Sequence, residues 1–222
     1  MGNTASSLIE YITESGVDVT KIIKEWYDED ETEVGDFPEP DIPTDQKSAF
    51  FGQDWTRELT SKEFSIIKFH LNNLIENIDN PLIVEVNSGL KPISKEIFSD
   101  VKIITSDLFG KNEILQKTAH DTLKDIHEDI DVVISFKPPP NLVCGPELAS
   151  AYEFVKKEQS KTKYFVCYGE MGGGEGSTDF WPWMKEMGWE LDKCLTIHCF
   201  TDMFSGKKCW KTLNIFKKIK KN

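Results

Sequence analysis

The spacing of hydrophobic residues along this chain changes at about residue 60. Before that point, apolar residues recur at helical intervals in two short stretches, around Leu8–Ile12 and across Val19–Trp26. Residues 28–45 contain nine acidic residues and no basic residue. Such a segment stays extended and solvated because it cannot bury enough apolar surface to fold. The pattern therefore predicts a helical extension over residues 1–27, an acidic, proline-containing linker over residues 28–46 and a folded domain over residues 47–222.

After residue 60, helical and strand patterns alternate. Thr60 and Glu63 have the spacing of a capping box, and apolar residues then recur at helical intervals from Phe64 to Ile78. Further helices are expected over residues 93–98, 146–157 and 177–187. Short runs rich in β-branched and aromatic residues predict strands over residues 82–86, 101–105, 112–118, 130–135, 164–168, 195–200 and 210–216.

The order of these elements predicts the fold class. Alternating strands and helices favour a parallel sheet with right-handed crossovers. The strands at 195–200 and 210–216 have no helix between them, so only a hairpin can join them and one of them must run antiparallel. We therefore expect an α/β protein, a Rossmann-like three-layer sandwich. Its sheet of six or seven strands should be mostly parallel, with a C-terminal antiparallel hairpin strand.

A proline-rich loop follows the strand predicted at 130–135. The segment Lys137-Pro138-Pro139-Pro140 cannot continue a sheet ladder, and each proline also restricts the residue before it. The loop is therefore stiff and extended. In open α/β sheets, ligands bind outside the carboxyl ends of the strands, and this loop should lie at that edge.

Composition narrows the classes of function. A chain of 222 residues with 39% hydrophobic residues can form one core-bearing domain with a short extension. The net charge of −12 disfavours general nucleic-acid binding, which requires positive charge to neutralise phosphates. The last sixteen residues carry seven lysines and no acid, so a local basic surface stays open as an alternative.

The five cysteines form no Cys-x-x-Cys pair, which indicates reduced thiols and a cytoplasmic location. Regular strand alternation would place Cys194 and His198 on one face and Cys199 on the other, which disfavours a zinc site. The sequence contains no run of 18 apolar residues and no signal-peptide core, so we expect neither a membrane-spanning helix nor a secretory leader.

Six features in chain order resemble the class I S-adenosylmethionine-dependent methyltransferases, over roughly residues 60–217. The terminal hairpin is one of them. The others are, in chain order, an acid followed by a glycine turn in Val84–Gly89, Asp107 after the second strand, Thr118–Asp121, Phe136–Pro140, and Tyr168–Glu170 with the glycine loop and Asp179–Trp189 behind it.

The resemblance implies S-adenosylmethionine as cofactor and a set of residues that contact it. These residues are Glu85, Asn87, Ser88, Gly89, Asp107, Leu108, Asp121 and Lys137. Glycine permits close backbone approach, Asp107 would accept the ribose hydroxyls, and Asp121 would accept the adenine amine. Each acid also has a plain structural interpretation: Glu85 as a strand-end charge, Asp107 as a cap of the turn at Leu108, and Asp121 as a solvated residue or helix cap. Lys137 would pair with the cofactor carboxylate or lie at the surface.

The departures from the family pattern bear on the acceptor. Asn87 and Lys91 stand where the family has small residues, although Asn tolerates the left-handed conformation of such a turn. Lys137 replaces the polar acceptor of the proline loop and has donors only, and Pro140 replaces the stacking aromatic residue. The sequence therefore predicts a methyltransferase-like protein whose acceptor is a small molecule or a protein rather than a base nitrogen. The alternatives are an inactive binding or structural module of the same fold and a nucleotide- or dinucleotide-binding oxidoreductase.

The N-terminus fits the N-myristoylation pattern, with Gly2 after the initiator and Ser6 at the sixth position. One myristoyl chain binds membranes only marginally, and the lysine-rich C-terminus would supply a second signal. The sequence thus offers a peripheral membrane or virion association through Gly2 as one hypothesis, and an ordinary N-terminus as the other.

Overall fold

The computed structural model describes residues 11–29, 59–107, 110–136, 162–171, 184–185, 188–201, 206 and 208–219. Several predictions fall outside these ranges: most of the helix near Leu8–Ile12, most of the acidic linker, the proline loop, the helix at 146–157 and most of the helix at 177–187. No helix in the described ranges is both long and apolar enough to cross a membrane.

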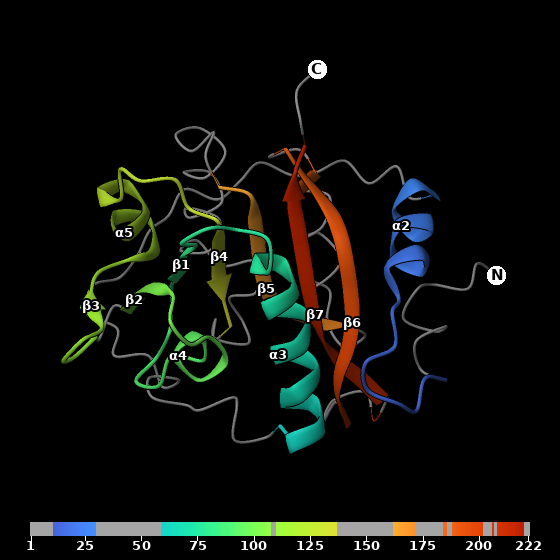
Figure 1. Cartoon of the computed structure of the whole chain (residues 1–222). Coiled ribbons are helices and arrows are strands. Elements are labelled where there is room, and N and C mark those ends of the chain that lie inside the picture. The colour runs from blue at the N-terminus through green and yellow to red at the C-terminus, as the bar shows by residue number, and fades with distance from the viewer. Residues whose placement is uncertain are drawn as a thin grey trace.

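The described strands form one seven-stranded sheet in the order β3-β2-β1-β4-β5-β7-β6 (Figure 1). Pairing is parallel from β3 to β5, whereas β7 runs antiparallel between β5 and β6. The expected mostly parallel sheet with an antiparallel C-terminal hairpin strand is confirmed. The strands are β1 (Leu82–Glu85), β2 (Lys102–Asp107), β3 (Leu115–Gln116), β4 (Val132–Ser135), β5 (Tyr164–Met171), β6 (Trp189–Thr201) and β7 (Lys208–Lys218).

Helices cover both faces of this sheet, as the three-layer prediction requires. The helices are α2 (Thr20–Glu29), α3 (Ser61–Ile75), α4 (Ser94–Ile97) and α5 (Ala119–Asp125). Side chains of α2 and α5 pack into one hydrophobic cluster with Val84 of β1. Those of α3 and α4 pack into a second cluster with Ile83, the preceding residue of the same strand. Successive residues of β1 therefore enter opposite cores, as strand alternation dictates.

The start of α3 confirms the predicted capping box. The Thr60 side chain accepts a hydrogen bond from the Glu63 amide, and the Glu63 carboxylate accepts one from the Thr60 amide at 2.7 Å. The helix ends at Ile75, earlier than the apolar spacing to Ile78 predicts.

The segment before α2 binds the outer edge of β6. Val19 donates its amide to the Cys194 carbonyl at 2.9 Å, and Thr196 donates to the Val17 carbonyl at 3.0 Å. Val19 is fully buried, as is Ile23 on α2. These contacts cover part of an edge strand that would otherwise present unpaired backbone groups. The division of the chain into extension, linker and domain stays a prediction.

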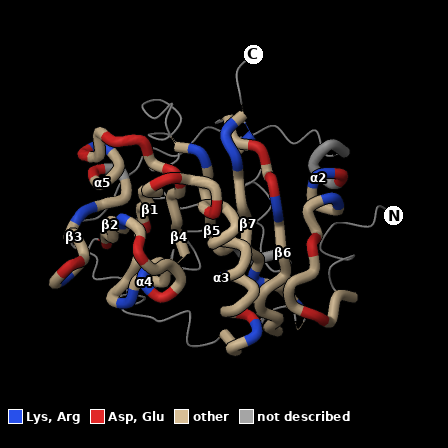
Figure 2. Tube along the Cα trace, in the orientation of Figure 1, with Lys and Arg blue, Asp and Glu red and all other residues tan. Residues whose placement is uncertain are grey.

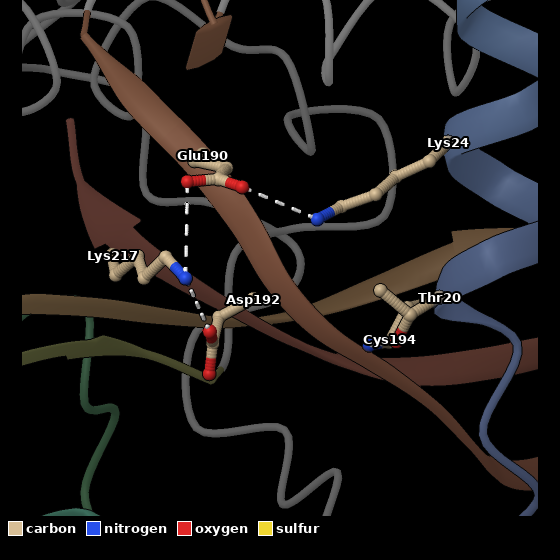
Figure 3. A network of polar contacts seen from close by, with 6 residues as sticks. All are labelled: Thr20, Lys24, Glu190, Asp192, Cys194 and Lys217. Atoms are coloured by element: carbon tan, nitrogen blue, oxygen red, sulfur yellow. Dashed lines mark hydrogen bonds and ion pairs between the residues drawn. The ribbon is translucent and has the colours of Figure 1, made fainter.

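Polar contacts also join α2 to the sheet (Figure 3). The Glu190 carboxylate lies between two lysines, 3.4 Å from Lys24 of α2 and 3.8 Å from Lys217 of β7, and Asp192 pairs with Lys217 at 3.0 Å. Over the described elements, Figure 2 shows positive and negative residues interspersed rather than gathered on one face.

The alternation predicted for Cys194, His198 and Cys199 is wrong, because β6 is not regular. Its register against β7 shifts between Thr196 and His198, where one extra residue forms a bulge. Cys194 and Cys199 consequently both pack with the first hydrophobic cluster, whereas His198 lies 3.7 Å from Glu63 of α3. A bulge exchanges the faces of all residues beyond it.

A candidate cofactor site at the carboxyl edge of the sheet

The loop after β1 turns sharply at two residues. Asn87 has φ of 53° and Gly89 has φ of 63°, the left-handed region that only Gly, Asn and Asp adopt at low cost. The loop is tied to both neighbouring strands: the Val86 amide donates to the Ile134 carbonyl at 2.9 Å, and the Ser88 amide donates to the Ser106 carbonyl at 3.0 Å. The loop is thus fixed at the carboxyl edge, over the ends of β1, β2 and β4.

Asp107, the last residue of β2, contacts this loop. Its carboxylate accepts a hydrogen bond from the Gly89 amide at 2.9 Å, and its carbonyl accepts one from the Gly110 amide at the same distance. The structure therefore brings together Asn87, Ser88, Gly89 and Asp107, which the sequence names as neighbours in one site. Their role in binding a cofactor stays a prediction.

Glu85 is fully buried at the end of β1, where an unpaired charge would be costly. Its two carboxylate oxygens accept hydrogen bonds from the Ile93 amide at 3.1 Å, the Ser94 amide at 2.9 Å and the Ser94 hydroxyl at 2.5 Å. Because these donors start α4, Glu85 sets where the loop ends and the helix begins. The contacts favour a role in shaping the loop over direct contact with a ligand.

Two buried hydroxyl groups at the same edge were not predicted. Ser106 of β2 and Ser135 of β4 are fully buried, and neither hydroxyl has a hydrogen-bond partner within the described chain. Glu85 of β1 pairs with Thr105 on one side and with Ile134 on the other. Ser106 and Ser135, the next residues of those strands, therefore lie on either side of Val86. With strands spaced about 4.8 Å apart, the two hydroxyls lie roughly 10 Å from each other. A serine at a strand end carries no distinctive sequence signal, which is why the pattern missed both.

Asp121 lies in the first turn of α5, beside the helix cap. Thr118 is the N-cap of α5, and its hydroxyl accepts the Asp121 amide at 3.1 Å and donates to the Asp121 carboxylate at 3.0 Å. The side chain is exposed. The helix itself was not predicted, because its seven residues are too few for a clear helical period. Leu108, Lys137 and Gly2 lie outside the described residues.

Lys91, which stands where the family has a small residue, is exposed, whereas Ser88 and Gly89 are buried.

Comparison with solved structures identifies the architecture. A proposed RNA methyltransferase of Pyrococcus horikoshii superposes with a TM-score of 0.52 at 12% sequence identity, over 79% of this chain and 92% of that chain. The chain has the class I methyltransferase fold. At this identity the likeness concerns the fold alone, and it confirms the resemblance drawn from the six motifs at that level.

Other methyltransferases are similar at lower scores and add nothing to the assignment of the methyltransferase fold. Magnesium protoporphyrin IX methyltransferase from Synechocystis, with bound S-adenosylmethionine, gives a TM-score of 0.48 at 9% identity, over 93% of this chain and 100% of that chain. Precorrin-6y C5,15-methyltransferase from Geobacter metallireducens gives a TM-score of 0.45 at 11% identity, over 77% of this chain and 98% of that chain. No family model and no curated protein sequence matches the chain.

The residues at the carboxyl edge of the sheet, over the ends of β1, β2 and β4, fit a nucleoside-containing cofactor. Asn87 and Gly89 hold the loop in a sharp turn, and the Asp107 carboxylate, which accepts the Gly89 amide, stands at the end of β2 beside it. The hydroxyls of Ser106 and Ser135, which find no partner among the described residues, are the kind of buried polar group that a ligand or ordered water satisfies.

Proposed function

We propose that this chain binds S-adenosylmethionine over the carboxyl ends of β1, β2 and β4 and acts as a methyltransferase on a small molecule or a protein. The observation that carries the proposal is the hydrogen bond from the Gly89 amide to the Asp107 carboxylate. It joins the turn after β1 to the acid after β2, at the edge where ligands bind in open α/β sheets.

Each residue has a distinct part in this proposal. Asp107 accepts the ribose hydroxyls, and the backbone of Asn87, Ser88 and Gly89 allows the cofactor to approach closely. Glu85 holds the loop in place through α4 and does not touch the ligand.

Three further predicted contacts rest on the family resemblance. Asp121 would accept the adenine amine, Leu108 would contact the cofactor, and Lys137 would pair with the cofactor carboxylate. When bound, the cofactor supplies an electrophilic methyl group on a sulfonium, and the protein accelerates transfer mainly by positioning the acceptor and excluding water.

The proposed acceptor is not a base nitrogen. Lys137 has only donors and cannot take a hydrogen bond from a target amine, and Pro140 offers no ring for a base to stack on. Myristoylation of Gly2, with peripheral membrane contact through it and the C-terminal lysines, is part of the alternative proposal that the fold serves as an inactive module.

Calorimetric titration with S-adenosylmethionine tests the proposal. Asp107→Ala should weaken binding by roughly 1–3 kcal/mol, the cost of losing charge-assisted hydrogen bonds. Asp79→Ala is the matched control, because Asp79 is exposed and precedes β1 at the opposite, amino end of that strand. Absence of binding to the unmodified protein would reject the cofactor assignment. Equal binding by the Asp107 variant would remove that residue from the site.

A further inference from the structure

The loop between β1 and α4 lies where many open α/β sheets bind phosphate. In dinucleotide-binding folds, the turn after the first strand and the amides that follow it hold the pyrophosphate, and glycines let the backbone approach it. Such a cradle requires backbone N–H groups that are free to donate to the anion. The partners of the amides in residues 86–94 therefore decide whether this loop can hold a phosphate.

Three amides of the turn are already bound within the chain. Those of Val86 and Ser88 donate to carbonyl groups of β4 and β2, at 2.9 and 3.0 Å. The Gly89 amide donates to the Asp107 carboxylate at 2.9 Å. Gly89 is the residue at which a glycine turn would approach a phosphate most closely, and here its amide faces a negatively charged group of the protein.

The amides where the loop meets α4 are bound by a second carboxylate. Ile93 donates to one oxygen of Glu85 at 3.1 Å, and Ser94 donates to the other through its amide at 2.9 Å and its hydroxyl at 2.5 Å. Glu85 is fully buried. A phosphate would have to compete with this carboxylate for the same donors, and it would do so beside a buried charge of its own sign, where repulsion is strong.

The lysines of this segment stand in solvent. Lys91 and Lys95 are exposed, and the Lys95 ammonium pairs with Glu113 at 2.7 Å. Salt screens exposed charges far more than buried ones, so the lysines attract an anion less effectively than the buried Glu85 repels it. The buried part of the loop is therefore negative and has its amide donors engaged, which is the reverse of a phosphate cradle.

We propose that this loop selects a nucleoside cofactor that carries no phosphate on its ribose, with Glu85 and Asp107 as the residues that determine the selectivity. Asp107 repels a phosphate beside Gly89, and Glu85 withholds the donors at the start of α4. A ligand without phosphate meets neither obstacle. The inference rests on the proposed function, and it distinguishes that function from binding of a nucleotide or dinucleotide, an alternative that the sequence leaves open.

Calorimetric titrations with methylthioadenosine and ADP, without divalent cations, test this selectivity. Both ligands contain adenosine, so the ratio of their affinities isolates the effect of the phosphates. The unmodified protein should bind ADP about tenfold more weakly or worse. Glu85→Gln and Asp107→Asn each remove one charge and should bring the ratio closer to one, whereas Glu96→Gln, an exposed control on α4, should leave it unchanged. A variant that is merely destabilised would lose affinity for both ligands alike.

Pyrophosphate alone tests the loop independently of the nucleoside. The amide signals of Gly89, Ile93 and Ser94 should show no saturable shift beyond that caused by sodium chloride at the same ionic strength. A saturable shift there, ADP binding as tight as that of methylthioadenosine, or a ratio unchanged in Asp107→Asn would overturn the inference, and this holds even if Glu85→Gln does not fold. If neither methylthioadenosine nor S-adenosylhomocysteine binds, the cofactor proposal fails instead, and the pyrophosphate titration still reports on the loop.

Discussion

Removal of the Glu85 carboxylate should destabilise the fold strongly. Glu85→Ala leaves the Ile93 amide, the Ser94 amide and the Ser94 hydroxyl without their acceptor in a fully buried site. Each buried donor that loses its partner costs about 1–3 kcal/mol, so the sum should be at least about 3 kcal/mol even when the hydroxyl turns to another partner. Domains of this size are stable by only about 5–15 kcal/mol, so the loss is a large fraction of the total.

Urea unfolding followed by tryptophan fluorescence measures this loss. Glu85→Gln keeps the shape of the side chain and one acceptor oxygen but turns an NH2 group toward donors. Its loss of unfolding free energy should therefore be smaller than that of Glu85→Ala but greater than zero. Glu96→Gln is the control on the same helix; Glu96 is exposed, and its substitution should change the unfolding free energy by less than about 0.5 kcal/mol. An unfolding free energy for Glu85→Ala within about 0.5 kcal/mol of the unmodified protein would refute the assignment of Glu85 as the anchor of α4.

Two further outcomes are expected. Gly110→Ala should lower the free energy of unfolding by roughly 1–3 kcal/mol in the same assay, because a Cβ there would lie 2.6 Å from the Leu115 carbonyl oxygen. An unchanged unfolding midpoint would contradict this close approach. Burial, and secondarily the charge of Lys193, lowers the pKa of His70 below its ordinary value of 6.5. The unfolded chain then binds a proton at His70 more readily than the folded chain, so the free energy of unfolding should fall as the pH drops below about 6.5. If His70→Asn leaves the pH dependence of the unfolding free energy unaltered, the burial argument is contradicted.

The sequence predicted the elements best where one local pattern determines them. The capping box at Thr60 and Glu63 needs only four residues, and the hairpin of β6 and β7 follows from the absence of a helix between two strands. The meeting of Gly89 and Asp107 was predictable in outline, because parallel strands end at one edge of the sheet.

The features that the sequence did not predict depend on contacts between distant segments. The bulge before His198 is a shift of register against β7, which no local spacing records. The binding of Val17 and Val19 to β6 joins residues that lie far apart in the chain, and it depends on which strand forms the sheet edge. The buried hydroxyls of Ser106 and Ser135 become notable only once the register places them around β1.

The central claim is that a nucleoside cofactor binds where the loop after β1 meets the end of β2. Amide chemical-shift mapping with S-adenosylhomocysteine tests this claim most directly, since each backbone amide reports its own surroundings. We predict saturable shifts concentrated at Asn87, Ser88, Gly89 and Asp107, with small changes at the opposite edge near Asn80 and Asp131. Shifts confined to residues away from these strand ends, or no shifts at saturating ligand, would contradict the account.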